Sequence, residues 1–422
     1  MAIFYKIKKC RICKNKDLKK IIDLNNQYIQ GSFIKKNFPK PYLKKIPLQL
    51  ALCTKCSLVQ LLHTTKKEIL YKNYWYESGI NKTMKIHLKN LVNLIFKIKK
   101  REVKNIRVLD IGCNDGTLLK CYPKNVEKYG IDPSQIINKI DKKKVNVIRD
   151  FFPPQKKKFK NLKIKFDLIT SIAMFYDLQD PNSFVKNIKY NLKDKEIWVF
   201  ELSYLLDMLK LNSFDTICHE HLEYYSLHSL NYLMKNNRLK IFHISKNLIN
   251  GGSIRCFVTH DKNDYYDDKY NLNVLKKMIN NEKKLKINSL SIYKKFFIKI
   301  LKLKKKLNII IKKIKNQNKS IYILGASTKG NTILQFLEID NKILPYAVER
   351  NKEKIGAKTI GSNIKIISEK SAKKNPPNYQ LVLPWHFKNE IIKRELNYLK
   401  KGGNLIFPLP KIKIINKRNL NL

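Results

Sequence analysis

The chain has 422 residues, too long for one ordinary hydrophobic core, so we expect two to four domains. A formal net charge of +54 is typical of proteins that bind nucleic acid or anionic membranes. However, lysine, asparagine and isoleucine are frequent in every region, as an AT-rich coding sequence would produce, so we expect no nucleic-acid partner. The same charge would attract an anionic small-molecule substrate.

Residues 1–10 contain no apolar core of signal-peptide length, and no later run approaches the roughly 20 apolar residues that a membrane span needs. We therefore expect no membrane insertion and a cytoplasmic location. In that compartment the eight cysteines are metal ligands or buried thiols rather than disulfides. The sequence does not indicate an oligomeric state.

Two C-x2-C knuckles mark the first piece of the chain, which we delimit as residues 1–70. They are Cys10-Arg-Ile-Cys13 and Cys53-Thr-Lys-Cys56. Each knuckle offers two thiolates, and two knuckles complete a tetrahedral shell that leaves no position for water. We therefore predict a structural zinc ion; the alternative is four cysteines that share no ligand.

The second piece, residues 71–282, begins with the aromatic segment "YKNYWYESGINKTMKIHL" and a helix that we expect to end near Lys100. The stretch "RVLDIGCNDGTLL" then predicts a strand over residues 108–111, a turn with Gly112 and Gly116, and a helix start. Glycines in such a turn let the backbone approach a ligand closely. The pattern is not the dinucleotide fingerprint; it resembles the first motif of class I S-adenosylmethionine methyltransferases.

Further strand ends follow this motif. The stretch "YGIDPS" places Asp132 at a strand end, where an acid can accept both ribose hydroxyls, although a solvated acid there is an alternative. The stretch "VNVIRDFF" supplies Asp150 and Phe151 for the adenine. The stretches "FDLITSIAMFYDLQDP" and "EIWVFELSY" are the fourth and fifth strands. Strands that alternate with helices at this spacing predict a parallel sheet covered on both faces.

Residues 283–315 form a basic, helical third piece. Its apolar residues recur at steps of three and four: Ile292, Phe296, Ile300, Leu303, Leu307, Ile310 and Ile314. We expect a connecting helix that packs on the neighbouring domains; a helix on a membrane surface is the alternative.

The last piece, residues 316–422, repeats the strand, glycine turn and helix in "SIYILGASTKGNTILQFL" and ends with "GGNLIFPLP". It predicts a second, smaller α/β unit that serves another ligand or a subunit contact. The stretch "NPPNY" lacks the aromatic residue that directly follows the second proline in amino-group methyltransferases, so we interpret it as a turn. The predicted fold class is α/β, with a Rossmann-like core, a four-cysteine domain and a smaller Rossmann-like domain.

The stretch "FDTICHEHLEYYS", residues 214–226, contains paired histidines. In an extended segment, His219 and His221 would project to one face and could bind a metal with Cys218 or Glu223. A structural pair of histidines with satisfied hydrogen bonds is a second alternative. A third is a base, because the pKa of histidine suits proton removal near neutral pH.

Taken in order, the pieces resemble the nucleotide-sugar C-methyltransferases of deoxysugar biosynthesis. The resemblance covers nearly the whole chain and rests on the four-cysteine head and on "PLQLALCTKCSLVQL", "LDIGCNDGTLL", "HEH", "NGGS", "GASTKGNT" and "PWHF". It implies S-adenosylmethionine as cofactor, structural zinc, and a nucleotide-diphosphate ketosugar as substrate. The implied reaction is methyl transfer, through an enolate, to a carbon beside the ketone.

The resemblance also implies roles for individual residues. It makes His221 the base, with Glu220 as its neighbour, and a hydroxyl of Tyr74, Tyr76 or Tyr224 could donate to the enolate oxygen. The residues expected around the methyl donor are Asp110, Gly112, Asn114, Asp115, Gly116, Asp132, Asp150, Phe151, Tyr74 and Ser78. Those expected around the nucleotide-sugar are Lys329, Gly330, Asn331, Thr332, Glu349 and His386.

The chain departs from the family pattern at four places. Cys218 stands where the family is expected to have a residue with an aromatic hydroxyl, and the loop "SIAMFYDL" lacks an expected histidine. Glu349 replaces an aspartate, and His386 replaces an asparagine. These changes concern the particular sugar more than the reaction. Two other functions stay open: an RNA methyltransferase with a zinc-ribbon anchor, and a nucleotide-sugar-binding scaffold without turnover.

Overall fold

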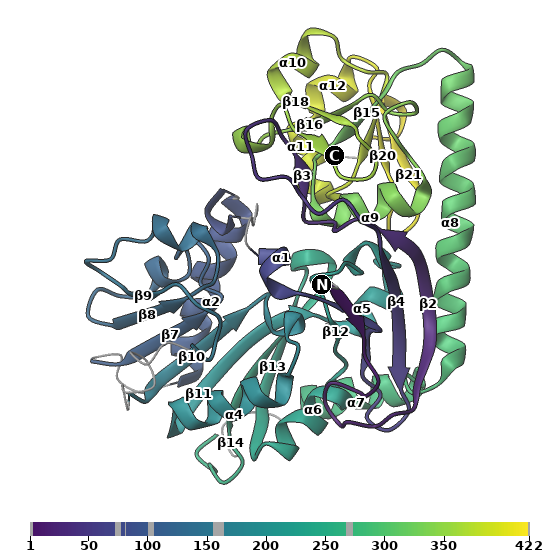
Figure 1. The fold of residues 1–422 in the computed structure, drawn as a ribbon. Helices are drawn as coiled ribbons and strands as arrows, with labels where there is room; N and C mark the ends of the chain where they lie inside the picture. Colours follow the sequence, from purple (N-terminus) through teal and green to yellow (C-terminus); the bar gives the residue numbers. More distant parts are fainter. Residues whose placement is uncertain are drawn as a thin grey trace.

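The computed structural model describes residues 3–71, 77–80, 82–99, 105–154, 164–266 and 273–420. Figure 1 shows a seven-stranded sheet at one end of the molecule and an eight-stranded sheet at the other. A four-stranded sheet lies between them, next to the long helix α8 (Leu290–Asn316). This arrangement confirms the α/β fold class.

The seven-stranded sheet has the order β13-β14-β11-β10-β7-β8-β9. Its strands are β7 (Arg107–Ile111), β8 (Glu127–Ile131), β9 (Asn146–Ile148), β10 (Phe166–Ile172), β11 (Leu192–Ser203), β13 (Leu239–Asn247) and β14 (Ser253–His260). Strands β7 to β11 are parallel, and β14 is antiparallel to β11. Because the strand order reverses between β7 and β10, a crevice for a ligand is expected at the carboxyl ends of these two strands.

Helices α2 (Lys82–Lys99), α4 (Pro181–Asn191) and α6 (Leu227–Asn236) accompany this sheet, and α1 (Lys67–Tyr71) and α5 (Leu205–Lys210) are short. The prediction of a helix after the glycine turn was wrong. Only the 3-10 turns η2 (Leu119–Cys121) and η3 (Gln135–Lys139) connect β7, β8 and β9. Tyr122 adopts an extended conformation before Pro123, as steric contact with a following proline favours, and this ends the helical turn.

The four-stranded sheet has the order β12-β5-β4-β2. It combines β2 (Leu18–Gln27), β4 (Ile46–Cys53) and β5 (Val59–Leu61) with β12 (Glu223–Tyr224), which comes from the second piece of the chain. A separate pair consists of β1 (Phe4–Lys6) and β6 (His63–Thr65). No pattern in the sequence indicates that β12, directly after the paired histidines, joins the sheet formed by residues 18–61, here called the cysteine domain.

The eight-stranded sheet has the order β21-β20-β19-β15-β16-β18-β17-β3. Its strands are β15 (Ile321–Leu324), β16 (Tyr346–Glu349), β17 (Lys358–Thr359), β18 (Lys365–Ser368), β19 (Tyr379–Val382), β20 (Asn404–Phe407), β21 (Lys413–Ile415) and β3 (Phe33–Ile34). Its helices are α9 (Thr328–Leu337), α10 (Glu369–Lys374), α11 (Lys388–Arg394) and α12 (Leu396–Lys400). The "NPPNY" stretch is the turn from α10 into β19, as predicted.

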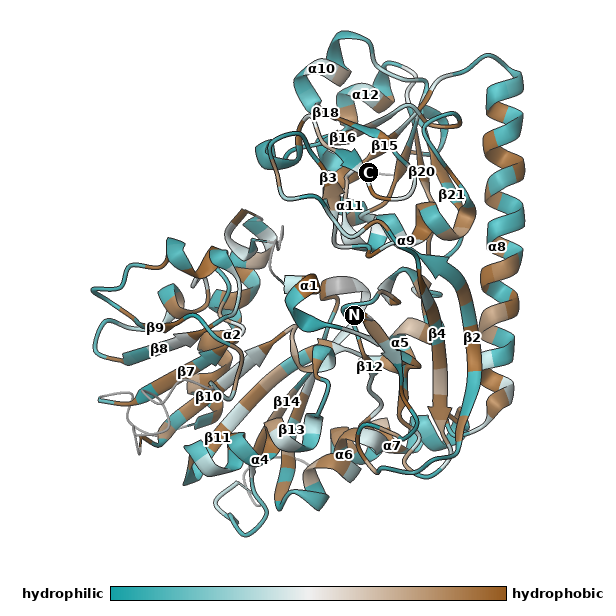
Figure 2. Ribbon diagram, in the orientation of Figure 1, coloured by the Kyte–Doolittle hydropathy of each residue, from teal (hydrophilic) through white to brown (hydrophobic). Residues whose placement is uncertain are grey.

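Helices α7 (Asn273–Lys284) and α8 lead from the seven-stranded to the eight-stranded sheet. The apolar stripe of α8 packs into a core shared with β2, β4 and the C-terminal sheet, which confirms a packed connecting helix. Ile292 and Ile310 are partly buried and pack against this core, and the residues beside them, Tyr293 and Ile311, are fully buried. Figure 2 shows hydrophobic residues recurring along α8.

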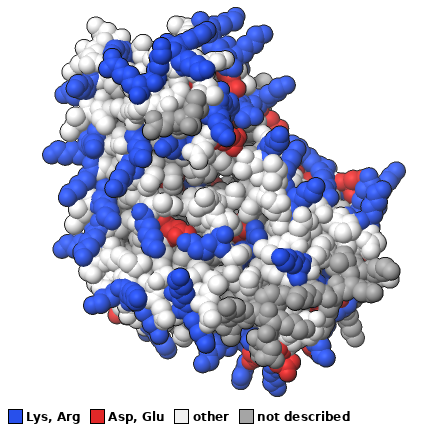
Figure 3. All heavy atoms as spheres, turned by 180° about the vertical axis from the view of Figure 1, so that it is seen from behind, with Lys and Arg blue, Asp and Glu red and all other residues white. Residues whose placement is uncertain are grey.

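Figure 3 shows one face of the molecule, on which lysine and arginine side chains are spread widely and do not gather in one patch. Among the described residues, no helix combines the length and the apolar character that crossing a membrane would require.

Candidate active site

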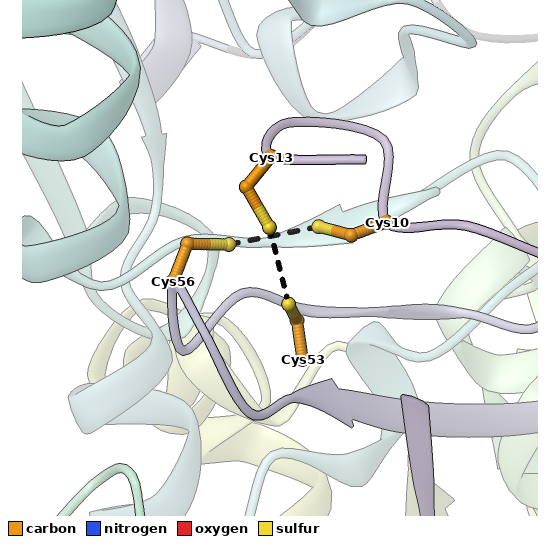
Figure 4. A group of neighbouring side chains, drawn as sticks. All are labelled: Cys10, Cys13, Cys53 and Cys56. Carbon is orange, nitrogen blue, oxygen red and sulfur yellow. Dashed lines mark hydrogen bonds between the residues drawn. The ribbon is translucent and has the colours of Figure 1, made fainter. Parts of the chain in front are cut away.

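The four predicted zinc ligands meet at one end of the four-stranded sheet (Figure 4). The Sγ atoms of Cys10 and Cys56 are 3.6 Å apart, and those of Cys13 and Cys53 are 3.4 Å apart. All four sulfur atoms lie within 4.8 Å of one another. Such a set of thiolates fits a closed tetrahedral zinc shell, and these four residues would hold the ion.

Arg11, inside the first knuckle, connects this cluster to the next strands. Its Nη1 donates to Leu61 O over 2.7 Å and its Nη2 to Thr64 Oγ1 over 2.7 Å. Its Nε lies 3.5 Å from Glu223 Oε1 on β12, and both side chains are buried. The cysteine cluster therefore fixes the strand that begins two residues after His221.

The glycine turn after β7 lies against the loop after β10. A Cβ at Gly112 would come within 2.9 Å of Met174 Cγ, so only glycine allows this close approach. Beneath the turn, Asp110 Oδ1 accepts a hydrogen bond from Thr170 Oγ1 over 2.7 Å. Burial raises the pKa of Asp110 to about 7. This glycine turn, here called the cradle, lies at the point where the strand order reverses, where a ligand is expected to bind.

Asp132 borders the same cradle from the end of β8. Its Oδ2 accepts from Asn114 N over 3.0 Å and its Oδ1 accepts from Ser134 N over 2.8 Å. Ser134 Oγ also donates to Oδ1 over 2.5 Å. Because a carboxylate oxygen can accept two hydrogen bonds, Oδ2 keeps capacity for a ribose hydroxyl. The cradle and this acid fit the adenosyl part of S-adenosylmethionine.

The side chains inside the glycine loop serve a different purpose. Asn114 Oδ1 accepts from Ser78 N over 3.0 Å, and Asp115 Oδ2 accepts from Gly79 N over 2.7 Å. They hold the 3-10 turn η1 (Ser78–Ile80), which precedes α2, over the loop. A Cβ at Gly116 would meet Ile140 at 2.9 Å, so this glycine permits close packing.

Asp150 and Phe151 follow β9. Asp150 Oδ1 accepts from Phe151 N over 2.8 Å. The ring of Phe151 lies edge-on to Tyr71 with centroids 6.2 Å apart, and Lys67 Nζ stands 3.9 Å from the ring centroid. Helix α1 therefore covers Phe151. Tyr74 and Tyr76 lie outside the described residues.

Residues 213–222, here called the histidine segment, begin with the turn η5 (Phe214–Thr216). His219 is 1% exposed. Its Nδ1 lies 2.8 Å from Gln30 Oε1 and its Nε2 lies 3.2 Å from Ile46 O. Burial lowers the pKa of His219 to about 4. A neutral ring carries one N–H and donates to one of these two oxygens, so His219 holds the segment against the cysteine domain.

His221 differs from His219. Its Nδ1 lies 2.7 Å from Thr216 O, and because a carbonyl only accepts, this nitrogen carries the hydrogen and Nε2 keeps its lone pair. The ring contacts Tyr176, with centroids 4.4 Å apart, and Tyr176 belongs to η4 (Phe175–Asp177) after β10. Burial and then the Lys329 ammonium lower the pKa of His221 to about 3, so the ring is neutral at pH 7. This geometry suits a proton acceptor.

Glu220 points toward the cysteine domain. A Cβ at Gly31 would come within 1.8 Å of Glu220 Oε1, so the turn before β3 lies directly on this carboxyl group. Glu220 Oε2 is 3.7 Å from Cys218 Sγ, and burial raises the pKa of Glu220 to about 7. Tyr224 is 4% exposed and belongs to the apolar core.

A metal between the paired histidines finds no support in the structure. In the described part of the chain, the four cysteines are the one group of three or more such side chains arranged to hold an ion.

The C-terminal sheet has its own reversal of strand order, between β15 and β19. A Cβ at Gly325 would meet Pro384 at 2.7 Å, and one at Gly330 would meet Leu383 at 2.6 Å. The next residue along, Trp385, donates from Nε1 to Asp215 Oδ2 in the histidine segment over 2.9 Å. The carboxyl end of β19 therefore lies next to the histidine segment, at the edge of the sheet where a ligand is expected to bind.

The predicted nucleotide-sugar residues divide into two groups. Asn331 Nδ2 donates to Gln30 O over 2.7 Å, and Thr332 Oγ1 donates to Ile217 O over 3.0 Å. Both side chains are buried and connect α9 to neighbouring segments. Glu349 accepts from Ala326 N over 2.8 Å and caps the turn after β15. By contrast, Lys329 and His386 are half-buried. Burial and then Lys329 lower the pKa of His386 to about 3.

Three family models match successive parts of the chain. Residues 10–71 match a zinc binding domain, residues 81–244 a methyltransferase domain, and residues 248–410 a C-methyltransferase C-terminal domain. The chain therefore combines a methyltransferase domain with a zinc binding domain and the C-terminal domain found in C-methyltransferases. The C-methyltransferase NovU of Streptomyces niveus is 23% identical to it over 413 residues, which cover 97% of each chain.

Solved structures resemble a part of this methyltransferase. An S-adenosylmethionine-dependent methyltransferase from Clostridium acetobutylicum has 13% identity and a TM-score of 0.32, covering 41% of this chain and 90% of its own. The plantazolicin methyltransferase BamL has 15% identity and a TM-score of 0.35, covering 43% and 87%. These scores add nothing to what the strand order establishes.

Sequence reasoning missed several residues that shape the methyltransferase site. Gln30 and Gly31 lie in a turn with no motif of its own, and Tyr176 lies in a loop that was noted only for lacking a histidine. Asp215 and Trp385 stand inside the quoted stretches "FDTI" and "PWHF". No spacing or motif around these residues marked them as part of a site.

Proposed function

We propose that the protein methylates a carbon beside the ketone of a nucleotide-activated 4-keto-deoxysugar, through an enolate. The observation that carries this proposal is His221, whose Nδ1 is committed to Thr216 O and whose Nε2 can take a proton. Proton removal beside a ketone needs such a base. The full-length similarity to NovU supports carbon as the methylated atom.

The chain's residues have separate tasks in this reaction. Gly112 and Asp132 hold the methyl donor at the ends of β7 and β8. When bound, that donor supplies a methyl group on a sulfonium. His221 Nε2 removes the proton from the sugar carbon, and Tyr176 fixes the plane of its ring. Alignment of the enolate carbon with the methyl group is the enzyme's main contribution to the transfer.

We place the nucleotide-sugar between the histidine segment and the crevice after β15 and β19. Trp385 and Asp215 join these two elements directly. In the same proposal the chain divides into residues 1–70, 71–282, 283–315 and 316–422, as the composition suggests. The sugar then contacts the second and fourth divisions, while the first supports them through Gln30.

The test incubates the protein with S-adenosylhomocysteine and a panel of thymidine-diphosphate 4-ketosugars in deuterated water. Wild-type protein should exchange the hydrogen beside the ketone and, with S-adenosylmethionine, transfer methyl to the same carbon. His221→Asn keeps a donor for Thr216 O but lacks Nε2, so exchange should stop. His228→Gln, at an exposed histidine nearby, is the matched control. Exchange at the wild-type rate in His221→Asn would remove His221 from the base role.

A further inference from the structure

One face of α9 runs alongside the histidine segment. Phe336 packs edge-on against Phe214 with ring centroids 5.6 Å apart, and one turn earlier Thr332 Oγ1 donates to Ile217 O over 3.0 Å. The helix and the segment therefore run in opposite directions. Side chains three and four positions apart share a helix face, so Lys329 lies one further turn along. It faces the part of the segment that follows residue 217.

The charges around Lys329 agree with this position. After burial, its ammonium is the main cause that lowers the pKa of His221 and of His386. Burial lowers the pKa of Lys329 itself, whereas Asp215 and Cys218 favour its charged form. Asp215 is 1% exposed and shares the histidine segment with His221. The ammonium thus stands among groups on both sides of the proposed sugar site.

An enolate needs such a charge. When a proton leaves the carbon beside a ketone, negative charge develops on the carbonyl oxygen, and a fixed donor aimed at that oxygen lowers the barrier. Tyr224, the other proposed donor among the described residues, is 4% exposed and packs in the apolar core. The cation on α9 is directed at the same segment that carries the base.

We infer that Lys329 is the electrophile that stabilises the enolate oxygen while His221 removes the proton, an inference that rests on the proposed function. The C–H bond of the sugar breaks, and its proton forms an N–H bond at Nε2 of His221. The electron pair forms the C=C bond, and the carbonyl π pair moves onto the oxygen beside Lys329, which keeps its own protons. The enolate carbon then bonds to the methyl group, and the C–S pair stays on sulfur.

This arrangement explains how a base with a low pKa can act. The Lys329 ammonium opposes a second positive charge at His221. The enolate places a negative charge between the two cations, so proton transfer to His221 becomes more favourable as the enolate forms.

The experiment compares Lys329→Gln and Lys329→Arg with the wild-type protein in the deuterium exchange assay at saturating ketosugar. Lys342→Gln removes the same charge from an exposed position after α9 and is the control. We expect Lys329→Gln to lower the exchange rate by about 10²- to 10³-fold, the usual effect of removing one oxyanion donor. Lys329→Arg, which keeps the charge, should retain most of the rate. Thymidine diphosphate affinity, measured by calorimetry, should not change.

Two results would overturn the inference alone. One is wild-type exchange in Lys329→Gln; the other is a loss of thymidine diphosphate affinity with normal exchange at saturation, which would make Lys329 a phosphate ligand. Absence of exchange in the wild-type protein across the ketosugar panel would instead overturn the proposed function together with the inference. An NMR titration needs no turnover: the pKa of His221 should rise in Lys329→Gln, and an unchanged pKa would contradict the placement.

Discussion

Replacing Gly31 with alanine tests whether the turn before β3 sets the position of Glu220. A Cβ at this position would lie 1.8 Å from Glu220 Oε1, whereas ordinary contact begins at 3.4 Å. The carboxyl group must therefore retreat by about 1.6 Å, the difference between these distances. Because Glu220 is 5% exposed, it cannot simply turn into water. The φ angle of Gly31 lies outside the left-handed region, so alanine adds a steric contact without backbone strain.

The displacement should reduce activity more than stability. Overpacking of this kind costs about 1–3 kcal/mol. Glu220 precedes His221 in a turn closed by the hydrogen bond from His221 N to Cys218 O over 3.2 Å, so the base moves with it. A shift of about 1 Å at a reacting group typically lowers the rate about 10²-fold. The glycine loop after β7 is not involved, so affinity for the methyl donor should persist.

The assay measures kcat for methyl transfer and, by calorimetry, the Kd of S-adenosylhomocysteine. Glu220→Asp shortens the side chain and should make room for the added methyl group. Gly31→Ala should therefore lower kcat about 10²-fold in the wild-type background and only slightly in the Glu220→Asp background. A double-mutant cycle measures this difference. An equal loss in both backgrounds, or a wild-type kcat in Gly31→Ala, would refute the reasoning.

Three further changes have defined outcomes. Cys13→Ser should lose zinc and lower both the melting temperature and kcat, because the knuckle holds Arg11 against β12; metal analysis with thermal unfolding checks this. Asp132→Asn should weaken S-adenosylhomocysteine binding by about 1.5–3 kcal/mol, the value of a hydrogen bond to a charged group, as calorimetry will show. Burial raises the pKa of Asp110 from 3.8 to about 7, so the folded state holds a proton that the unfolded chain releases. The free energy of unfolding of the wild-type protein therefore falls as the pH rises from 3.8 to about 7. Asp110→Asn lacks this loss, so its melting temperature should rise relative to that of the wild-type protein between about pH 5 and pH 8.

The strands β7 and β8 of the seven-stranded sheet were predictable because the sequence patterns that indicate them are local. An apolar run, a glycine turn and a strand-end acid follow one another around Gly112 and Asp132, and each has its meaning from a few neighbouring residues. The cysteine cluster was predictable for the same reason, since C-x2-C spacing is itself a local geometry. The missing helix after β7 shows the limit, because an apolar helix start did not outweigh the proline at position 123.

The roles of the paired histidines could not be read from the sequence. His219 and His221 have the same chemistry and nearly the same neighbours along the chain. What separates them is Gln30, 189 residues away, which lies 2.8 Å from one ring, and the carbonyl of Thr216, which orients the other. Partners at such separations are set by how the domains pack. For the same reason, the sequence around Asn331 and Thr332 suggested a ligand-binding loop and did not reveal that both side chains hold neighbouring segments by hydrogen bonds.

The histidine segment has little regular structure of its own, so its geometry depends on tethers. Within the described residues it contains one 3-10 turn and leads into a strand of two residues. The cysteine domain holds it through Gln30 and, by way of β12, through Arg11. The C-terminal domain holds it through Thr332 and Trp385. Each tether is a buried hydrogen bond or ion pair, so its geometry is well defined and the loss of one partner strongly destabilises the fold. A zinc ion that takes no part in the chemistry would therefore still be needed for it, because the position of the base depends on a strand that the zinc knuckle fixes.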